Sequence, residues 1–270
     1  MIPKIIHYVW VGSAPKSDLI LKCIESWKKY CPDYKIREWN NDDVSRIDNA
    51  YVKEAFNCKK WAFVSDYLRL YALKTQGGFY FDSDLEITQP IDEFRNKAFI
   101  SGYENWYGTY SPITAFMGAE KNNKIISDLL DEYKDLHFVV KGKMDQTTNT
   151  KRISEYLQRH FKISIPYDGT QKTELCTNCV IYPSYYFCTP EKNKENYSVH
   201  HFNGSWLDPS ERKSYSRKQY FRIGRLKLVK FKKNLNVEGN DIPLHDNEKI
   251  LFSFNVSQRK KICLLRKVKK

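Results

Sequence analysis

The chain reads Gly-Gly-Phe-Tyr-Phe-Asp-Ser-Asp at residues 77–84. The aromatic run predicts a short buried strand, and the paired glycines before it are typical of the end of a helix. Side chains alternate between the two faces of a strand, so Asp82 and Asp84 project to the same side and Ser83 to the other. The two carboxylates then lie about 6 to 7 Å apart. Because unpaired charge beside an apolar strand is costly, we expect the pair to share a cation, most simply a hard divalent ion.

Strand and helix patterns alternate on both sides of this stretch. Apolar runs predict strands at residues 4–11 and 34–39, and apolar residues at helical spacing predict helices at 17–31 and 59–74. This order is typical of an α/β fold, with a mostly parallel central sheet and helices on both faces. Ligands bind such sheets beyond the carboxyl ends of the strands, where the two aspartates lie. The pattern continues with strands at 99–103 and 114–118 and helices at about 123–135 and 147–160.

Positive charge is concentrated at one end of the chain. Residues 211–270 hold 18 Lys and Arg against 5 Asp and Glu, whereas the first 210 residues hold 27 of each. We therefore expect a folded domain at residues 1–210 and a basic, partly helical appendage at residues 211–270 that associates with a membrane or binds the acceptor. Cations interleaved with apolar side chains favour an anionic membrane surface. Nucleic-acid binding ranks lower because no nucleic-acid-binding motif is recognisable, and a solvated tail is the plain alternative.

Composition indicates the class of protein and the cellular compartment that we expect. Its 41% hydrophobic and 15% aromatic content indicates a globular protein, and no apolar run reaches the roughly 18 to 20 residues that span a bilayer. The apolar N-terminal run lacks a signal-peptide cleavage pattern, so a cytoplasmic setting is expected. Seven cysteines, an odd number, fit reduced thiols better than a disulfide framework. Three of them, Cys176, Cys179 and Cys188, form an alternative set of zinc ligands that lacks a fourth member at zinc-ribbon spacing.

Four short motifs follow one another along the chain, namely Pro-Lys-Ile-Ile-His-Tyr-Val-Trp-Val-Gly at 3–12, Ala-Phe-Val-Ser-Asp-Tyr-Leu-Arg at 62–69, the Asp-Ser-Asp stretch at 77–84, and His-His-Phe-Asn-Gly-Ser-Trp at 200–206. Together they resemble glycosyltransferase family 32, the enzymes with a sugar-binding Asp-x-Asp motif. The family includes capsular polysaccharide enzymes and is related to the catalytic domains of the clostridial glucosylating toxins. The resemblance covers about residues 1–210. It implies a GT-A fold, a nucleotide-sugar donor, Mn²⁺ or Mg²⁺, and retention of anomeric configuration.

The resemblance also implies which residues bind the donor. Trp10 would stack on the nucleobase, with a core tryptophan as the alternative. Asp66 and Arg69, three apart on a helix, would bind donor-sugar hydroxyls, with Arg69 also near the phosphates; a simple helix salt bridge is the alternative. Tyr80 lines either the donor site or the core. Hydrogen bonds to the leaving diphosphate would come from the final Ser-Trp pair. The full implied set is Val9, Trp10, Ser65, Asp66, Arg69, Tyr80, Asp82, Ser83, Ser205 and Trp206.

The resemblance makes Asp84 the firmer metal ligand. Asp82 would reach the ribose or donor sugar as well as the metal. A third ligand is expected far along the chain, where a histidine imidazole would complete a mixed oxygen and nitrogen shell suited to Mn²⁺. Counting back from the Ser-Trp pair favours His201, with Asn203 and His200 as alternatives, and a surface histidine pair is the plain interpretation.

The segment Lys-Met-Asp-Gln at 143–146 departs from the Gly-Pro common in family 32 and resembles the Asp-Gln of family 8 retaining enzymes. There the glutamine lies beside the anomeric carbon. Asp145 and Gln146 would therefore shape the sugar site and complete a catalytic set with Asp82, Asp84 and Arg69. A helix cap at Asp145 is the alternative.

These patterns predict a retaining, metal-dependent glycosyltransferase that moves a hexose or N-acetylhexosamine from a nucleotide sugar, with a UDP-sugar favoured. The expected acceptor is a glycan linked to polyprenyl diphosphate at the inner face of the plasma membrane, in the synthesis of capsule, O-antigen or another surface polysaccharide. One alternative is a toxin-like effector that glycosylates host proteins. Another is an inactive protein that binds nucleic acid or anionic membranes, against which the complete motif set argues.

Overall fold

The computed structural model describes residues 1–106, 109–202, 215–223, 226–233, 248–257 and 260–267. The chain divides into two compact units, Met1–Asn203 and Gly204–Lys270. The division falls between residues 203 and 204, not between 210 and 211 as the charge distribution predicted. Each unit is described below by itself.

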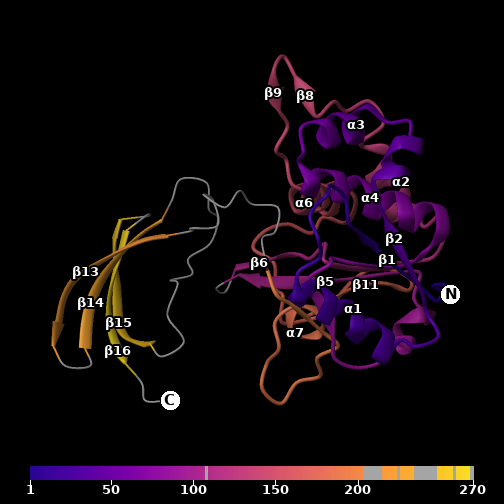
Figure 1. The fold of residues 1–270 in the computed structure, drawn as a ribbon. Helices are drawn as coiled ribbons and strands as arrows, with labels where there is room; N and C mark the ends of the chain where they lie inside the picture. The colour runs from indigo at the N-terminus through magenta and orange to yellow at the C-terminus, as the bar shows by residue number, and fades with distance from the viewer. Residues whose placement is uncertain (107–108, 203–214, 224–225, 234–247, 258–259, 268–270) are drawn as a thin grey trace. The chain divides into compact units, whose positions relative to one another are not determined.

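Strands and helices alternate along the first unit (Figure 1). Its strands are β1 Ile5–Val9, β2 Lys35–Trp39, β3 Gly78–Phe81, β4 Leu85–Ile87, β5 Phe99–Trp106, β6 Thr109–Pro112, β7 Phe116–Ala119, β8 Val139–Val140, β9 Lys143–Met144, β10 Thr173–Cys176, β11 Cys179–Tyr182 and β12 Ser198–His200. Its helices are α1 Asp18–Tyr30, α2 Asn41–Arg46, α3 Ala50–Asn57, α4 Trp61–Gln76, the short 3-10 helix η1 Asp92–Asn96, α5 Lys124–Asp131, α6 Asn149–Phe161 and α7 Ser184–Phe187.

The central sheet is mostly parallel, as predicted. Its strand order is β10-β11-β5-β7-β3-β1-β2, with β6 paired to β5. Strands β2 and β3 run parallel to β1, and β11 runs parallel to β5. Strand β7 lies between β3 and β5 and is antiparallel to both, so β3 and β5 run in the same direction. Strands β1, β2, β3, β5 and β11 therefore share one direction. Asp82 follows β3 directly, at the same edge of the sheet as the end of β1.

Helices cover both faces of this sheet, with α2, α3, α4 and α6 on one side and α1 and α7 on the other (Figure 1). Strand β3 shows why two separate cores form. Tyr80 packs into the core beneath α3, α4, α5 and α6. Phe79 and Phe81 pack into the opposite core with α1 and α7. Alternation along the strand thus sends successive aromatic side chains into different cores.

The two glycines before β3 are required by the backbone. Gly77 and Gly78 have φ angles of 66° and 105°, a region that favours glycine. A Cβ on Gly78 would lie 2.6 Å from the carbonyl oxygen of Ile5. The chain can therefore end α4 and enter β3 alongside β1 only with glycine. His7 Nε2 lies 2.8 Å from the Gly77 carbonyl oxygen and holds the same junction.

Helices α2 and α3 were not predicted, because both are short and the segment between β2 and α4 begins with polar residues. Local capping explains them. The Asn40 side chain accepts hydrogen bonds from the first turn of α2 while the Asp43 carboxylate reaches back to the Asn40 backbone, a reciprocal capping box. The Asn49 side chain accepts from Val52 N and begins α3. Caps of this kind can start short helices without an apolar repeat.

The second unit corrects the prediction of a partly helical appendage. Its described residues form four antiparallel strands, β13 Tyr215–Ile223, β14 Leu226–Lys233, β15 Glu248–Ser257 and β16 Lys260–Lys267, in the order β13-β14-β16-β15. Branched and aromatic residues recur at a spacing of two in segments such as Ile262–Leu264, and this spacing suits a strand better than a helix. The basic charge is therefore carried on a sheet.

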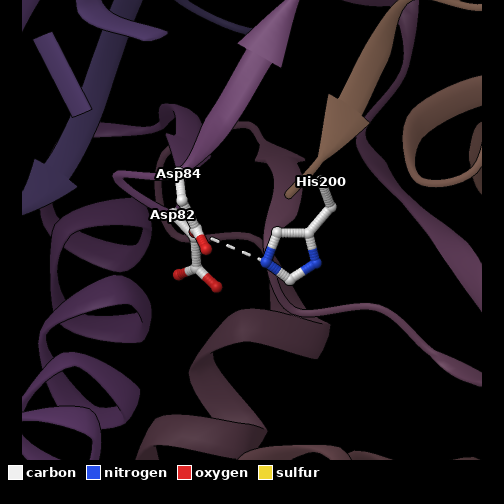
Figure 2. Close-up of side chains that lie close together, drawn as sticks. All are labelled: Asp82, Asp84 and His200. Carbon is white, nitrogen blue, oxygen red and sulfur yellow. Dashed lines mark ion pairs between the residues drawn. The ribbon is translucent and has the colours of Figure 1, made fainter. Parts of the chain in front are cut away.

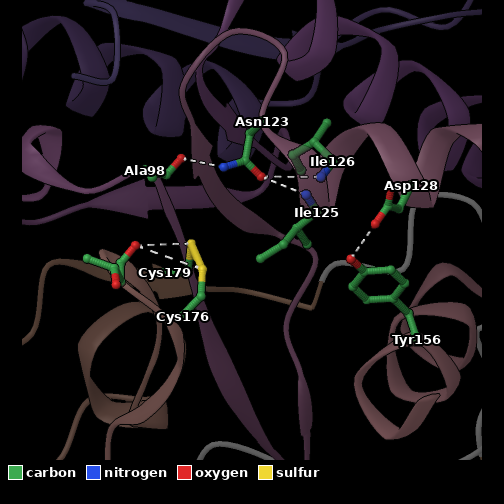
Figure 3. Close-up of a disulfide and its surroundings, with 9 residues drawn as sticks. Ala98, Asn123, Ile125, Ile126, Asp128, Tyr156, Cys176 and Cys179 are labelled. Carbon is green, nitrogen blue, oxygen red and sulfur yellow. Dashed lines mark hydrogen bonds between the residues drawn. A yellow bond between two sulfur atoms is a disulfide. The ribbon is translucent and has the colours of Figure 1, made fainter. Parts of the chain in front are cut away.

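The structure also corrects the expectation of reduced thiols for one cysteine pair. Cys176 and Cys179 lie opposite each other in the tight β10–β11 hairpin and form a disulfide (Figure 3). Cys23, Cys31, Cys58 and Cys188 have free thiols. Cys176 and Cys179 bond to each other and, among the described residues, form no metal-binding cluster with Cys188, so the zinc alternative gains no support.

Candidate metal and donor site

Asp82, Asp84 and His200 point toward one another (Figure 2). Each offers one ligand atom, and these atoms all lie within 4.8 Å of one another. Asp82 and Asp84 come from the turn that joins β3 to β4, in which Leu85 N donates to the Asp82 carbonyl at 2.9 Å. His200 ends β12, and its Nε2 lies 3.4 Å from Asp84 Oδ1.

Pairing of β12 with β4 brings the histidine to the acids. The two strands are antiparallel, with Val199 opposite Glu86 and His200 opposite Leu85. His201 N then donates to the Asp84 carbonyl at 3.2 Å. A segment more than 100 residues later in the chain is thereby held against the Asp-Ser-Asp turn.

The structure corrects the preference for His201. The Nε2 atom of His201 lies 2.9 Å from Glu86 Oε2, and Lys22 also binds this carboxylate. Consecutive residues at a strand end face different sides, so only one of the two histidines can meet the aspartates. Strand pairing makes that residue His200. The other alternative, Asn203, lies outside the described residues.

Charge around His200 controls its protonation. Burial alone would lower the pKa of the imidazole, but contact with Asp84 and Cys188 and the charge of Asp82 raise it to about 10. Without a cation between the acids, His200 is therefore an imidazolium that compensates their negative charge. A histidine that ligates a metal must instead be neutral, so a divalent ion and this proton compete for the same site.

We expect Mn²⁺ affinity to fall as the pH falls, by about tenfold per pH unit below pH 10, because each bound ion must displace the His200 proton. Calorimetric titration with Mn²⁺ at pH 7 and 8, in buffers of different ionisation enthalpy, should show the release of about one proton per ion. A His200→Ala variant should bind more weakly and release none, whereas His201→Ala should match the wild type. Proton release that persists in His200→Ala would contradict the assignment.

Arg69 is held entirely by protein atoms. It lies on α4 with only 4% of its side chain exposed, and its Nη1 is 3.2 Å from Asp82 Oδ1 while Nη2 is 3.1 Å from Asp66 Oδ1. Nη1 also donates to the Thr114 carbonyl at 2.7 Å, and Nε donates to the Ser65 carbonyl at 3.2 Å. All three nitrogens thus have partners within the fold. The geometry makes Arg69 a residue that positions Asp82, where the resemblance implied a contact with phosphates.

Tyr80 completes this support. Its hydroxyl donates to Asp82 Oδ1 at 2.9 Å, and the Arg69 guanidinium lies over its ring at 4.6 Å from the centroid. The side chain is buried in the core between α4 and the sheet. The Tyr80 ring therefore packs in the core while its hydroxyl orients a carboxylate of the site. One Asp82 oxygen is fixed by two side chains, and the carboxylate can keep its orientation toward Asp84.

Asp66 connects α4 to the first turn of α6. Its Oδ2 accepts a hydrogen bond from Asn149 N at 3.2 Å, and its other oxygen pairs with Arg69. The backbone N–H groups at a helix N-terminus favour an anion there. Burial raises the pKa of Asp66 to about 6 despite these partners. Asn149 was not predicted as a site residue. The Thr-Thr-Asn sequence that contains it indicates only the start of a helix.

Asp145 and Gln146 lie just before α6. Asp145 Oδ1 accepts from Thr147 N at 3.0 Å, and Oδ2 lies 2.6 Å from Arg152 Nη2. Burial would raise the pKa of Asp145, but the Thr147 hydrogen bonds and the Arg152 charge lower it. Gln146 is exposed. Asp145 thus shapes the turn into α6, although the N-cap itself is Thr148. No contact joins this pair directly to Asp82 or Asp84 among those of the described residues.

Val9 and Trp10 end β1 at the same sheet edge as Asp82. Val9 is buried in the core. Trp10 is partly exposed, and its indole Nε1 donates to the Ala14 carbonyl at 3.0 Å. Lys16 Nζ lies 5.5 Å from the ring centroid. Part of the ring is thus accessible at the ligand-binding edge of the sheet.

Two predicted serines have different surroundings. The Ser65 hydroxyl donates to the Ala62 carbonyl and accepts a hydrogen bond from Arg69. Ser83 lies in the turn between the acids. The predicted diphosphate contacts Ser205 and Trp206 lie outside the described residues.

The donor set fits a divalent cation. Two carboxylates and one imidazole form a mixed oxygen and nitrogen set, which suits Mn²⁺ and, through the carboxylates, Mg²⁺. The two carboxylates carry negative charge close together, and the His200 imidazolium compensates it. A divalent ion would supply the same compensation more strongly.

Comparison with known proteins supports this chemistry. Residues 17–100 match the family described as "Glycosyltransferase sugar-binding region containing DXD motif". The chain is 28% identical over 105 residues to an uncharacterized glycosyltransferase of Acanthamoeba polyphaga mimivirus, a match that covers 37% of this chain and 42% of the relative. The chain thus spans less than half the length of this curated relative.

Two solved glycosyltransferase structures are similar to part of the chain. PaToxG glycosyltransferase is 22% identical with a TM-score of 0.43, over 58% of this chain and 70% of that one. The ligand-free glycosyltransferase domain of the YGT toxin is 16% identical with a TM-score of 0.32, over 48% of this chain and 62% of that one. Likenesses this partial say nothing about substrate.

Residues 17–100 of the mixed α/β unit, which include the acid pair after β3, are thus similar to the glycosyltransferase sugar-binding region that contains the DXD motif. Asp82, Ser83 and Asp84 supply that motif. The predicted resemblance is confirmed at this level.

Proposed function

We propose that the protein is a retaining, metal-dependent glycosyltransferase that transfers a hexose or N-acetylhexosamine from a nucleotide sugar, preferentially a UDP-sugar, to a glycan acceptor. The observation that carries this proposal is the convergence of Asp82, Asp84 and His200 at the ligand-binding edge of an α/β sheet. These three residues would hold Mn²⁺ or Mg²⁺. Bound there, the ion would neutralise negative charge on the donor diphosphate as the sugar departs.

The chain's own residues prepare that site. Arg69 and Tyr80 fix one oxygen of Asp82, which leaves the carboxylate oriented before the donor arrives. Preorganised charge of this kind accelerates a reaction because no reorientation is needed as charge develops. The exposed part of Trp10 would stack on the nucleobase. Asp145 and Gln146 would border the sugar on the α6 side, with the acceptor hydroxyl giving its proton to the departing phosphate.

We further propose a lipid-linked glycan acceptor at the inner face of the plasma membrane, in the synthesis of a surface polysaccharide such as capsule or O-antigen. The basic second unit supports this location, since cations near anionic lipid favour binding. Within the described parts of the chain, the helices are all too short or too polar to cross a bilayer. Contact with a membrane would therefore be made by a surface in this part of the protein.

Hydrolysis of a panel of nucleotide sugars tests the proposed activity. When the acceptor is absent, water is the available nucleophile, so we expect one donor to be cleaved slowly in the presence of Mn²⁺. A UDP-sugar should be the preferred donor, and chelation should abolish the cleavage until Mn²⁺ is restored. Cleavage that is unchanged by the chelator would contradict metal dependence. Failure to cleave any donor, even with a glycan acceptor present, would contradict the proposed activity.

A further inference from the structure

One face of the second unit's sheet combines exposed apolar and basic side chains. On β16 the side chains of Cys263 and Leu265 are fully buried, whereas Ile262 and Leu264 are partly exposed and Arg266 is exposed. Side chains alternate along a strand, so the partly exposed residues share the face opposite the buried pair. We call this the open face.

Strand register extends the open face across the sheet. Leu264 lies opposite Leu228 on β14 and Phe252 on β15, and Phe252 is 64% exposed. A β-bulge between Ile250 and Phe252 leaves Leu251 as the extra residue, 47% exposed. Bulges redirect side chains at sheet edges. The apolar part of the open face therefore consists of Leu226, Leu228, Phe252, Ile262 and Leu264, with Leu251 beside it.

Basic side chains border these apolar residues. Arg266 lies opposite both Leu226 and Lys249, and Arg266 and Lys249 are exposed. Like charges directly opposite each other destabilise a sheet. Together with the 18 Lys and Arg against 5 Asp and Glu of residues 211–270, this pair favours a partner that carries many negative charges.

We infer that the open face docks on the headgroup region of an anionic phospholipid bilayer. Cations beside aliphatic and aromatic side chains match a surface in which phosphate groups lie directly above acyl chains. Nucleic acid would satisfy the charges, but its phosphate backbone gives Leu226, Leu228, Ile262 and Leu264 no apolar partner. Phe252 and Leu251, on the edge strand, are the residues placed to enter the interface. This inference is independent of the proposed glycosyl transfer.

Vesicle sedimentation of the full chain tests the inference, with neither donor nor metal present. The chain should bind phosphatidylcholine vesicles that contain phosphatidylglycerol, bind pure phosphatidylcholine much more weakly, and dissociate as salt rises. Phe252→Glu should lower the partition coefficient about tenfold, since a phenylalanine leaves the apolar interface. Lys249→Gln and Arg266→Gln should each lower it about fivefold, the loss expected for one cation near anionic lipid.

Matched changes on the first unit serve as controls. Leu21 on α1 is 48% exposed, and Lys29 ends the same helix with its side chain exposed. Leu21→Glu and Lys29→Gln should leave vesicle binding unchanged. Phe252→Ser, combined with thermal melting, checks that the loss in Phe252→Glu does not come from unfolding.

Equal binding by wild type and the Phe252 variants would overturn the inference, as would equal binding to neutral and anionic vesicles. Single-stranded RNA that competes fully with vesicles, without dependence on Phe252, would show nucleic acid to be the partner instead. Because vesicle binding is measured without substrate, its failure would leave the proposed transferase activity standing.

Discussion

Replacing Asp84 with Asn is expected to lower metal-dependent nucleotide-sugar cleavage by about a thousand-fold, because a bound divalent ion contributes several kcal/mol of transition-state stabilisation. Asp84 lies beside both Asp82 and His200. The asparagine amide carries no negative charge, so the variant loses one of the two carboxylates that would bind the ion. The rate should be measured with saturating Mn²⁺. Mn²⁺ affinity should fall in the same variant.

Glu86→Gln is the matched control for this change. Glu86 lies two residues further along, but it binds Lys22 and His201 and not the cluster. Its substitution should change the cleavage rate little. Both variants should melt cooperatively near the wild-type temperature, since neither group lies in an apolar core. Full activity in Asp84→Asn, with Mn²⁺ stimulation retained, would remove the acid pair from the mechanism.

Replacing Arg69 with Lys is expected to lower kcat for cleavage by 10- to 100-fold, the usual effect of losing a group that orients a metal ligand. Lysine keeps the charge, but a single ammonium cannot span Asp66, Asp82 and the Thr114 carbonyl as the guanidinium does. If Arg69 positions Asp82, the affinity for UDP without metal should remain unchanged. If Arg69 instead contacts the donor phosphates, that affinity should fall. Equilibrium binding of UDP to the chelated protein separates the two roles.

Arg69→Ala should have a different and larger effect on folding. It leaves Asp66 and Asp82 without their buried cation, and breaking a buried ion pair typically costs about 3–5 kcal/mol of unfolding free energy. Denaturant unfolding measures this loss. Arg152→Lys is a matched control, because Arg152 is also largely buried but binds Asp145. It should disturb the turn into α6 without lowering Mn²⁺ affinity. An Arg69→Ala variant as stable as the wild type would show that the network contributes little to the fold.

Much of the first unit follows from local pattern. Helices α1, α4, α5 and α6 and strands β1, β2, β3, β5 and β7 were all predicted within a few residues of their bounds, because each carries a clear apolar period. Strand alternation predicted that Asp82 and Asp84 share one side, whereas in the structure the turn between β3 and β4 brings them together. Helices α2 and α3 were missed, since both are short and begin at side-chain caps, although α3 buries Tyr51, Val52 and Ala55.

The third member of the cluster depended on contacts that local pattern does not encode. Sequence spacing favoured His201, but the register between β12 and β4 turns His200 toward the acids. The role of Arg69 has the same origin. The helix spacing predicted its pair with Asp66, whereas its contacts with Asp82 and Thr114 depend on how α4 packs on β3 and β7.

The second unit shows most clearly the difference between what the sequence predicts and what tertiary structure decides. Composition located its charge, but a mixture of Lys, Arg and apolar residues suits either an amphipathic helix or a strand, and the helical expectation was wrong. What the sequence alone determined is the alternation of strands and helices, the acid pair and the position of the basic segment, because these depend on neighbours within a few residues. The tertiary structure decided which histidine joins the acids, which way Arg69 faces and which side chains share the open face, because each depends on strand pairing or packing between segments that are distant in the chain.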